Sequence, residues 1–563
     1  ATEGPGAVDL LSIEQVVGAA RAAGADALHP GFGFLAENAA FAQAVLDARI
    51  RWVGPPPDAI RRMGDKGAAR RLAAELGVPV VPGNDEPDPS DAALAAAADS
   101  IGYPILVKPA AGGGGKGMRT VRAPDRLGAE LAAARREAAT AFGDDRLILE
   151  RLIEGPRHVE VQVLFDRHGE GVHLGERDCS VQRRHQKVLE ETPSPAVTPE
   201  IRARLGADAL RLAGGVGYES AGTCEFLLTD RGETFFLEMN TRLQVEHPVT
   251  ELVTGLDLVE EQLQIAAGEP LRITQAGSDA ARAAGGHAVE VRLYAEDAEN
   301  GFLPATGRVE RLVWPSGSGI RVDAGIDEGT DVGGRFDPML AKLIAHGADR
   351  AEALDRLTGA LDRTVVLGLT TNLRFLRWLL REPVVRDGQV RIDTLDRIWP
   401  PEDWTTRAAV PDFAWRAAAR ALAAGDPGRD GWRLNARPRV QVEIDGQERT
   451  VVLSDDPGEP RPKLVVRGET AFVDVAGRSV AVRIAPPPDV DRAARAAQSH
   501  HGGGPAELVA PMPGAVVAVH RTVGEPVEAG EPVVTLEAMK MEHVVAAPIA
   551  GVLAEVAVKP GEP

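Results

Sequence analysis

The sequence has little cysteine, an excess of acidic over basic residues and no long apolar run. Two cysteines among 563 residues cannot build a disulfide framework, so we expect a reducing, cytoplasmic environment. The 63 lysines and arginines are outnumbered by 83 aspartates and glutamates, and the net charge of −20 argues against a general nucleic-acid-binding protein. Apolar stretches are only a few residues long, which excludes a transmembrane helix and predicts no membrane partner.

The composition nevertheless supports a large folded protein. Apolar residues make up 44% of the chain, which is enough for several hydrophobic cores, and a chain of this length is expected to form about three to five domains. Residues 1–400 mix branched strands, alanine-rich helices and glycine loops, which predicts α/β or α+β layers. The clearest segments are strands at 105–107, 146–150 and 159–163 and helices at 91–98 and 133–141.

The next segment is expected to be helical over residues 401–430. The residues that mark its apolar side and its C-terminal stop are Phe413, Trp415, Leu422 and Gly425. Branched residues then alternate with polar ones at 440–444, and Asp445-Gly446 predicts a type I′ hairpin in a small all-β unit. Residues 486–506 are rich in proline and glycine and are expected to be a flexible linker.

The last segment contains an internal repeat. Residues 510–516 recur as residues 547–553, and residues 523–526 recur as residues 560–563, with the same offset of 37. Two copies are too few for a solenoid and instead predict a small barrel with pseudo-twofold symmetry. Between the copies, Glu537-Ala538-Met539-Lys540-Met541 places a lysine at a symmetric hairpin tip, where its amine would protrude.

The motif around Lys540 resembles the biotinyl domain of biotin-dependent carboxylases. In that family the lysine of this motif carries biotin as an amide, whereas a lipoyl domain of the same fold lacks methionine on both sides of its lysine. The alternative, an unmodified lysine, leaves Met539 and Met541 exposed without a reason. The resemblance therefore implies biotin on Lys540, attached by a biotin protein ligase.

A glycine-rich loop follows the predicted strand at 105–107. Glycines 112–115 would let backbone N–H groups approach phosphate oxygens, while Lys108 and Lys116 would neutralise phosphate charge. The loop is not a Walker motif, because no Gly-Lys-Ser/Thr follows. By itself it could equally be a flexible glycine turn.

A candidate metal site lies on two predicted strands further along the chain. Glu225 and Glu238 are 13 residues apart, and a hairpin would place them beside each other and beside Asn240. Two carboxylates and an amide oxygen suit octahedral Mg²⁺ bound to a nucleotide. The alternative is a solvated pair on an edge hairpin, which the apolar neighbours on both sides make less favourable.

Three polar motifs resemble the biotin carboxylase component of the ATP-grasp fold. They are residues 238–248, 176–187 and 29–35. The first has a polar residue at every second position from Glu238 to Glu246, which predicts one strand face that meets a ligand or a partner. The basic cluster at 183–187 does not indicate a nucleic-acid surface, because no aromatic residues interleave with it. Together with the biotinyl motif, the resemblance extends over nearly the whole chain.

The resemblance implies a multidomain α/β protein: an ATP-grasp biotin carboxylase, a helix-plus-β-barrel linking domain and a C-terminal biotinyl, lipoyl-like β-barrel. The expected parts are a partial N-terminal carboxylase domain at 1–64, an ATP-grasp domain with a glycine-loop lid at 65–270, a C-terminal carboxylase domain at 271–400, a linking domain at 401–485, the linker at 486–506 and a carrier domain at 507–563. Both ends are expected to be incomplete, because the resemblance starts inside the first domain and the second copy of the repeat stops early.

The resemblance also implies roles for individual residues. In catalysis, Glu246 would take the bicarbonate proton, Arg242 would grip bicarbonate, Lys187 would face bicarbonate and the γ-phosphate, and Arg321 would stabilise the biotin enolate. The implied ligands of Mg²⁺, or of Mn²⁺, are Glu225, Glu238 and Asn240. Glu150, Leu152 and His158 would line the adenine and ribose pocket. The other implied contacts are Lys66, Lys108, Gly113, Gly114, Lys116, Gln182, His185, Gln244 and Val245.

The implied reaction is ATP- and bicarbonate-dependent carboxylation of biotin on the chain's own carrier domain, as the α subunit of an acyl-CoA carboxylase. A carboxyltransferase β subunit would select the acyl-CoA and assemble with this chain in a homo- or hetero-oligomer. Residues 430–435 weakly resemble 3-methylcrotonyl-CoA carboxylase. Phe32 and Phe336 depart from the tyrosines usual in the family, and Phe32 removes a hydroxyl near the biotin pocket.

Two other functions stay open from the sequence alone. One is a carboxylate–amine ligase of the ATP-grasp fold, against which the carrier lysine Lys540 argues. The other is a biotin carrier fragment without catalysis. The intact set of Lys108, Glu225, Glu238, Arg242 and Glu246 argues against that second alternative.

Overall fold

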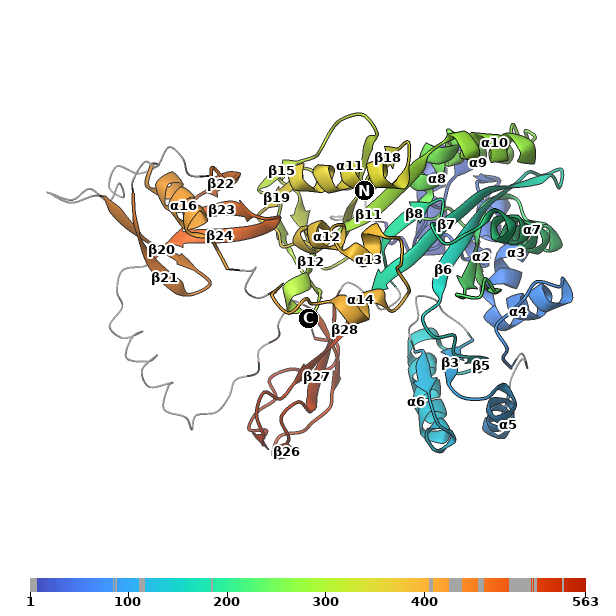
Figure 1. Cartoon of the computed structure of the whole chain (residues 1–563). Helices are drawn as coiled ribbons and strands as arrows, with labels where there is room; N and C mark the ends of the chain where they lie inside the picture. The colour runs from blue at the N-terminus through green and yellow to red at the C-terminus, as the bar shows by residue number, and fades with distance from the viewer. Residues whose placement is uncertain are drawn as a thin grey trace. The chain divides into compact units, whose positions relative to one another are not determined.

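The computed structural model divides the chain into two compact units, each built from helices and strands (Figure 1). The described residues are 8–84, 86, 89–110, 117–183, 186–404, 409–424, 438–453, 460–485, 508, 510, 514–538 and 541–562. The first unit is Ala1–Val291, Ile344–Leu357 and Pro383–Trp399, and the second is Arg292–Leu343, Thr358–Glu382 and Pro400–Pro563.

The first unit begins with a small parallel α/β layer. Its elements are α1 (Ile13–Ala22), β1 (Ala27–Leu28), α2 (Ala39–Asp47), β2 (Arg51–Trp52) and α3 (Pro57–Gly64), with β1 parallel to β2. The side chains of Ser12 and Asn38 accept backbone N–H bonds and so fix the starts of α1 and α2. Phe41, Trp52 and Ile60 are buried in the core of this layer.

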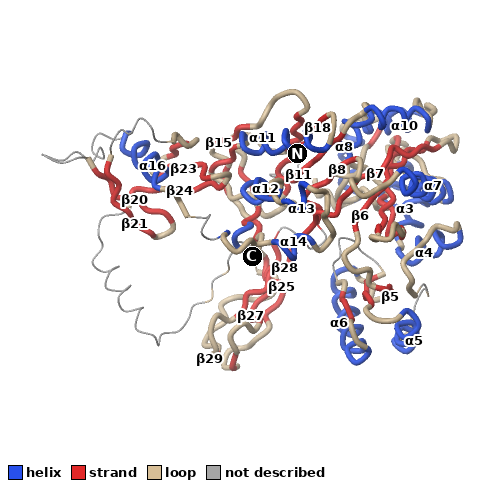
Figure 2. The backbone as a smooth tube through the Cα atoms, viewed as in Figure 1, coloured by secondary structure: helices blue, strands red, loops and turns tan. Residues whose placement is uncertain are grey.

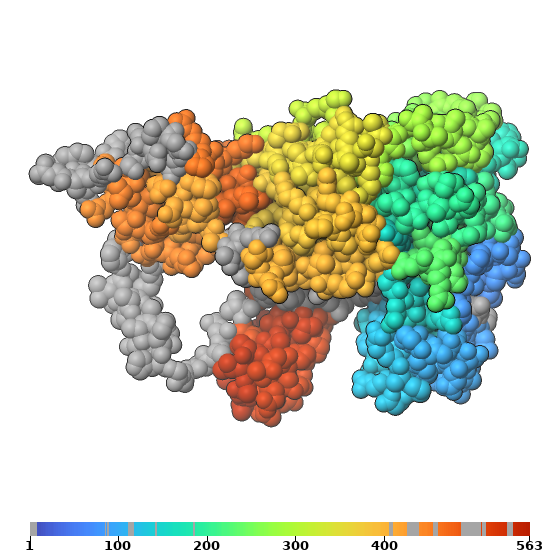
Figure 3. Space-filling view, in the orientation of Figure 1, coloured from blue at the N-terminus to red at the C-terminus, as the bar shows by residue number. Residues whose placement is uncertain are grey.

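A lobe of three antiparallel strands and two helices follows. Strands β3 (Ile105–Pro109), β4 (Arg119–Val121) and β5 (Leu147–Arg151) pair in the order β4-β3-β5. Helices α5 (Asp91–Ile101) and α6 (Pro124–Phe142) pack on these strands, and the lobe forms the blue-to-cyan surface in Figure 3. These bounds confirm the strands expected at 105–107 and 146–150 and the helices expected at 91–98 and 133–141.

The main sheet of the first unit carries the long strands. Its strand order is β10-β9-β6-β7-β8-β11. The strands are β6 (Arg157–Phe165), β7 (Gly171–Arg183), β8 (Gln186–Thr192), β9 (Ser220–Leu228), β10 (Thr234–Asn240) and β11 (His287–Tyr294). The helices packed against it are α4 (Lys66–Glu75), α7 (Pro199–Gly215), α8 (His247–Thr254), α9 (Leu258–Ala267) and α10 (Gln275–Ala284).

The alternation of side chains along β6 decides which residues face the polar side of this sheet. Val159, Val161 and Val163 join the apolar core that includes residues of α4 and α7. Leu164 joins a different core, which includes residues of α9. Because successive strand residues point to opposite faces, Glu160 lies on the same face as Leu164.

Short strands and helices complete the chain to residue 398. They are β12 (Glu296–Asp297), η1 (Ala298–Asn300), β13 (Leu303–Pro304), β14 (Gly307–Arg308), β15 (Arg311–Val313), β16 (Ile320–Ala324), β17 (Asp331–Val332), β18 (Met339–Gly347), α11 (Arg350–Arg363), β19 (Val365–Leu367), α12 (Leu373–Leu379), α13 (Pro383–Arg386) and α14 (Thr394–Ile398). None of the helices in the described ranges combines the length and the apolar character needed to cross a bilayer.

The segment after residue 401 is a helix followed by an antiparallel sheet. Helix α16 (Asp412–Ala424) starts later than the helix expected from residue 401, because Pro411 directly precedes it and proline is tolerated only at a helix start. Asp445 and Gly446 both have positive φ, at 47° and 79°, which confirms the type I′ turn. Gly425 lies outside the described residues.

The sheet of this segment has five strands in the order β21-β20-β24-β23-β22. They are β20 (Arg439–Ile444), β21 (Gln447–Val452), β22 (Leu464–Arg467), β23 (Thr470–Val475) and β24 (Arg478–Ile484). Trp415 and Leu422 of α16 are buried against it, as the apolar pattern predicts, and Phe413 packs at the edge of the same core. Closure of the sheet into a barrel remains a prediction, and the linker at 486–506 lies outside the described residues.

The C-terminal domain has the pseudo-twofold symmetry that the repeat predicts. Its strands are β25 (Ala515–Val519), β26 (Pro526–Val527), β27 (Pro532–Ala538), β28 (Met541–Ala546) and β29 (Gly551–Val552), and Figure 2 shows β25 and β27 side by side. The Gly524 N–H donates to the Leu553 carbonyl, and the Gly561 N–H donates to the Val516 carbonyl, both at 2.8 Å. Because each pair of equivalent residues is 37 positions apart, these two bonds confirm the register of the repeat.

Candidate active site

Four charged residues stand in one row across the main sheet. Arg177 on β7 is paired with Glu160 on β6, Glu160 with Glu225 on β9, and Glu225 with Glu238 on β10. Residues directly opposite in a sheet point to the same face, so three carboxylates lie side by side. Like charges in such positions are destabilising, and the row therefore requires cations.

Lys187 of β8 supplies one of these cations. Its Nζ lies 2.6 Å from Glu160 Oε2, 3.0 Å from Glu225 Oε1 and 2.6 Å from Glu246 Oε1. Burial opposes the charge of this lysine, but the three carboxylates outweigh burial and raise the pKa of Lys187 well above its usual value. Lys187 is therefore a permanently charged ammonium group at the centre of the cluster.

Arg177 supplies a second cation. Its Nε donates to Glu160 Oε1 at 2.6 Å, and its terminal nitrogens donate to Gln162 Oε1 at 2.8 Å, Thr250 Oγ1 at 3.0 Å and Thr223 Oγ1 at 3.2 Å. Arg177 and Glu160 are both fully buried, so this network joins β6, β7, β9 and α8 without help from solvent.

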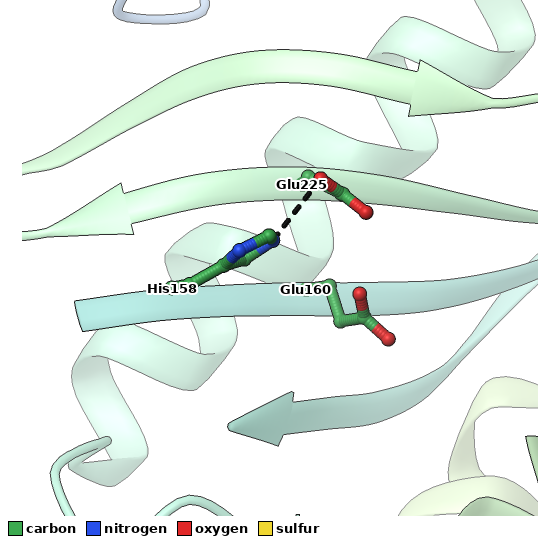
Figure 4. A group of neighbouring side chains, drawn as sticks. All are labelled: His158, Glu160 and Glu225. Atoms are coloured by element: carbon green, nitrogen blue, oxygen red, sulfur yellow. Dashed lines mark ion pairs between the residues drawn. The ribbon is translucent and has the colours of Figure 1, made fainter. Parts of the chain in front are cut away.

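His158 approaches the same row from β6. Its Nε2 lies 3.1 Å from Glu225 Oε2, and Figure 4 shows the ring directed toward that carboxylate. Burial opposes protonation of the ring, but the charge of Glu225 outweighs burial and raises the pKa of His158. The resemblance implies a place for His158 in the adenine and ribose pocket, and the structure places its ring against a predicted metal ligand.

The predicted metal ligands lie on neighbouring strands. The expected hairpin places Glu225 directly opposite Glu238, and Asn240 Nδ2 donates to Glu225 Oε1 at 2.9 Å. Burial and the like charge of Glu225 raise the pKa of Glu238, while Lys66 lies 3.9 Å away as a partial counter-charge. A divalent cation between these oxygens would relieve that repulsion, so the residues present fit Mg²⁺ or Mn²⁺.

Two further groups of side chains bring ligand atoms within 4.8 Å of one another. One group is His158, Glu160 and Glu225, and the other is Glu160, Cys179 and Glu246. Burial, followed by the charge of Glu160, raises the pKa of Cys179 well above its usual value, so its thiol stays protonated and binds metal poorly. Both groups contain Glu160, whose carboxylate is already paired with two cations.

The segment after Asn240 corrects one expectation. The alternation of charge from Glu238 to Glu246 suggested a continuous strand, but β10 ends at Asn240 and helix α8 begins at His247. Pro248 occupies the first turn of α8, where proline is favoured, and Glu246 is the residue that precedes the helix. The polar residues therefore converge through a turn and not along one strand face.

The turn brings several predicted bicarbonate contacts together. Arg242 donates to Asn240 Oδ1 at 3.1 Å and to Gln244 Oε1 at 3.3 Å. Gln244 Nε2 donates to Glu225 Oε1 at 3.3 Å. Val245 lies in the same turn, and Glu246 is fully buried beside Lys187.

The predicted phosphate contacts form a second basic group. Lys66 begins α4, and the Lys108 ammonium pairs with Glu150. Arg70 also pairs with Glu150, at 2.9 Å. Burial opposes ionisation of Glu150, but Lys108 and then Arg70 outweigh it and lower the pKa of this carboxyl. The Glu150 carboxylate thus holds Lys108.

Several other predicted residues are located by the structure. Leu152 follows β5, its N–H donating to the Pro104 carbonyl at 3.0 Å, and Gln182 is paired with Lys187 across β7 and β8. In the second unit, Arg321 on β16 forms a two-pronged ion pair with Asp323, at 2.8 and 2.9 Å. The predicted residues that lie outside the described ranges are Gly113, Gly114, Lys116, His185 and Lys540.

Glu160 and Arg177 were missed by reasoning from sequence. Glu160 lies in a strand that alternates polar and branched residues, and Arg177 lies in the run of three charged residues at 176–178; these were the available signals. Glu160 and Arg177 pair across the β6–β7 hairpin, where a register shift between Val161 and Val163 separates the pair from the turn, so counting back from the turn does not give it. The pairing of Glu160 with Glu225 joins segments far apart in the chain and leaves no local trace in the sequence.

Family models match most of the chain. They are "Biotin carboxylase, N-terminal domain" at residues 3–60, "Carbamoyl-phosphate synthase L chain, ATP binding domain" at 65–274, "Biotin carboxylase C-terminal domain" at 290–397 and "Biotin-requiring enzyme" at 506–563. A carboxylate–amine ligase would not need the last of these, and a carrier fragment would not need the first three.

Individual proteins give the same assignment. The mitochondrial methylcrotonoyl-CoA carboxylase subunit alpha of Oryza sativa subsp. japonica is 38% identical over 97% of this chain and 84% of its own length. The propionyl-CoA carboxylase alpha chain of Ruegeria pomeroyi is 37% identical over 97% of this chain and 88% of its own.

A solved structure supports the carboxylase region. The biotin carboxylase domain of Hydrogenobacter thermophilus 2-oxoglutarate carboxylase, in complex with MgADP, ADP and bicarbonate, is 42% identical, with a TM-score of 0.66 over 69% of this chain and 84% of its own. The chain therefore belongs to the α subunits of the biotin-dependent acyl-CoA carboxylases, which combine a biotin carboxylase with a biotinyl carrier domain.

Proposed function

We propose that the buried cluster around Lys187 is the place where this biotin carboxylase activates bicarbonate with ATP. The observation that carries the proposal is the position of the Lys187 ammonium, within 3.0 Å of carboxylate oxygens of Glu160, Glu225 and Glu246. One of these three carboxylates can act as a base if a second binds the metal and the third balances the charge of the protein's own cations. These three roles require different surroundings for each carboxylate.

Glu246 is the carboxylate placed to act as the base. It is fully buried, it lies in the turn that carries Arg242, and its Oε1 lies 2.6 Å from the Lys187 ammonium. Arg242 supplies a planar cation that suits a bicarbonate anion. Glu246 would accept the bicarbonate proton, which makes the bicarbonate oxygen a better nucleophile toward the γ-phosphorus of ATP.

Glu225 has the surroundings of a metal ligand. Burial opposes its ionisation, but Lys187 and His158 outweigh burial and hold the pKa of Glu225 well below its usual range. Glu225 is therefore a carboxylate at all physiological pH values; it stands opposite Glu238 in the sheet and accepts a hydrogen bond from Asn240. When bound there, Mg²⁺ or Mn²⁺ would neutralise phosphate charge, and Lys66 and Lys108 would add to that neutralisation.

The carrier lysine completes the proposal. Strands β27 and β28 are antiparallel and pair Glu537 with Glu542 and Ala538 with Met541, which are the described residues on either side of the predicted carrier lysine. Biotin attached to Lys540 would supply the ring nitrogen that accepts the carboxyl group. Arg321 is proposed to act on that ring, and the resemblance to the family alone supports this role.

Partners and substrate follow from the relatives. As the α subunit of a multisubunit carboxylase, the chain works with a β carboxyltransferase. We propose a short-chain or branched acyl-CoA as the final acceptor, because the relatives named above act on methylcrotonoyl-CoA and propionyl-CoA. We also propose a reducing, cytoplasmic environment, which the low cysteine content supports.

The test is transfer of labelled carbon from bicarbonate to biotin. The full chain is incubated with ATP, Mg²⁺, labelled bicarbonate and free biotin, and label in biotin is measured together with ADP release. We expect acid-labile label in biotin and ADP release that depends on bicarbonate. ADP release that requires an amine, or that proceeds equally without bicarbonate, would contradict the proposed function.

A further inference from the structure

Arg242 is held in place by four acceptors, of which one is charged. Its Nε donates to Glu37 Oε2 at 2.9 Å. Its Nη1 donates to the Leu243 carbonyl at 3.2 Å and to Gln244 Oε1 at 3.3 Å, and its Nη2 donates to Asn240 Oδ1 at 3.1 Å. The contact with Glu37 is the shortest of the four and the one that joins opposite charges.

Glu37 also fixes the backbone next to this arginine. Its second oxygen, Oε1, accepts the Thr241 N–H at 3.0 Å. Glu37 itself has little freedom, because Ala36 before it is buried and Asn38 after it caps α2. One carboxylate therefore joins the start of α2 to both the backbone and the side chain at residues 241 and 242.

We propose that Glu37 is a positioning residue for bicarbonate. It clamps Arg242 from the Nε side, so that the terminal nitrogens of the guanidinium are the ones presented to the anion. This inference rests on the proposed role of Arg242 in binding bicarbonate. Glu37 lies two residues after the sequence motif at 29–35, so this part of the chain would act on the turn that carries Arg242.

The relative strengths of the contacts support this orientation. Hydrogen bonds between charged partners are about twice as strong as neutral ones, so an arriving anion displaces the amide oxygens of Asn240 and Gln244 before it displaces Glu37. Both amides keep a partner when this happens, because each also donates to Glu225 Oε1. Arg242 then turns its terminal nitrogens to the anion while its Nε stays fixed.

The negative charge of Glu37 has an opposing effect, since it weakens the field that attracts an anion. The Glu37 side chain is 42% exposed, and water screens its charge strongly at longer range. Its hydrogen bonds to Thr241 and Arg242 act at contact distance and are screened far less. We therefore expect the loss of positioning to outweigh the gain in field when Glu37 is removed.

A set of three substitutions separates geometry from charge. Glu37→Ala removes both, Glu37→Asp keeps the charge but shortens the reach, and Glu37→Gln removes the charge but keeps an acceptor for Thr241. The measurement is ADP release by the full chain with free biotin, with bicarbonate varied at saturating ATP and Mg²⁺. Glu260→Ala is the matched control. Glu260 lies on α9 and forms an exposed ion pair with Arg272, at 2.9 Å.

We expect Glu37→Ala and Glu37→Asp to raise the KM for bicarbonate by about tenfold, the value for loss of one hydrogen bond to a charged group. Glu37→Gln should give a smaller increase. The KM for ATP and the Mg²⁺ requirement should stay at the values of the unmodified protein. Glu260→Ala should change none of these quantities.

Three outcomes would overturn the inference. A lower KM for bicarbonate in Glu37→Ala and Glu37→Gln, with no change in Glu37→Asp, would show that Glu37 acts only through its charge. An altered Mg²⁺ requirement with an unchanged bicarbonate KM would move its role to the metal site. An unchanged KM in all three variants would leave it no role in bicarbonate binding.

Arg242→Lys keeps this test separate from the proposed function. Lysine cannot form the two-pronged contact of a guanidinium, so the KM for bicarbonate should rise. If Arg242→Lys leaves that KM unchanged, the proposed role of Arg242 is wrong and the inference about Glu37 falls with it. If Arg242→Lys raises the KM and the Glu37 variants do not, only the inference about Glu37 is wrong.

Discussion

Glu160 and Glu225 stand directly opposite each other on β6 and β9, and the ammonium of Lys187 contacts both carboxylates. Glu160 has a second cation in Arg177 and is fully buried, whereas Glu225 has neighbours that suit a metal ligand. The pair thus divides two tasks. Glu160 neutralises the charges of Arg177 and Lys187, and Glu225 is the proposed metal ligand.

Replacing Glu160 with glutamine should destabilise the first unit. The substitution removes the charge that balances the buried Arg177 guanidinium. Removing one partner of a buried ion pair lowers the free energy of unfolding by about 3–5 kcal/mol. The free energy of unfolding from urea titration measures this loss. Glu260→Gln, which breaks an exposed pair, should cost about 0–1 kcal/mol. Equal effects of the two substitutions would show that the Glu160 network does not stabilise the fold.

Glu238→Gln should separate metal binding from stability. Burial and the charge of Glu225 raise the folded-state pKa of Glu238 above its unfolded value, so its ionised form destabilises the metal-free protein at pH 7. The glutamine variant should therefore melt at the same or a higher temperature without metal, while the Mg²⁺ concentration for half-maximal ADP release rises sharply. An unchanged Mg²⁺ titration would contradict the assignment of Glu238 as a ligand.

Glu191 should contribute stability that depends on pH. Its fully buried carboxylate accepts from His287 at 2.7 Å and from Arg350 at 2.6 and 2.9 Å, and these bonds outweigh burial and lower its pKa. A lowered folded-state pKa gives stability that is present above the unfolded pKa of about 4.3 and is lost as the pH falls through the folded value.

The measurement for Glu191 compares urea unfolding midpoints of the unmodified protein and Glu191→Gln. The difference between them should be large at pH 7 and should shrink below about pH 4, where glutamate in the unfolded chain is protonated. A difference that stays constant or grows on acidification would show that the Glu191 carboxylate has no lowered pKa.

Lys540 should carry biotin. Coexpression with a biotin protein ligase, followed by intact-mass analysis, should show one added biotin on the unmodified chain and none on Lys540→Ala. The reason is the lysine flanked by Met539 and Met541, which lies between the two copies of the repeat. Biotin retained by the alanine variant would place the attachment site elsewhere.

Local patterns predicted several features correctly. The spacing of Glu225 and Glu238 predicts the hairpin that brings them together, because a hairpin is a short-range structure, and a register shift between Phe236 and Glu238 then sets them directly opposite each other. The offset of 37 predicts the symmetric hydrogen bonds of Gly524 and Gly561 for a similar reason. Each of these predictions depends on residues that are close in the chain or repeated within it.

The features that the sequence did not predict depend on strand register, on contacts between distant parts of the chain or on proline. Alternation of charge continues past Asn240, but the chain turns there and enters α8 with Pro248 in its first turn. The pairing of Glu160 with Arg177 lies beyond a register shift in the β6–β7 hairpin, and Glu160 stands opposite Glu225 only because β6 and β9 are neighbours in the sheet. Glu37 contacts Arg242 from a separate layer of the first unit, and no spacing in the sequence indicates that contact.

The central claim is that Glu246 is the base that acts on bicarbonate. The most direct measurement is steady-state ADP release by Glu246→Gln with ATP, Mg²⁺, bicarbonate and free biotin. Removal of a catalytic base should lower kcat by about 10²–10⁴-fold, while the affinity for ATP changes little. Normal turnover at saturating substrate together with a loss of ATP binding would contradict this account and would place Glu246 in the nucleotide site.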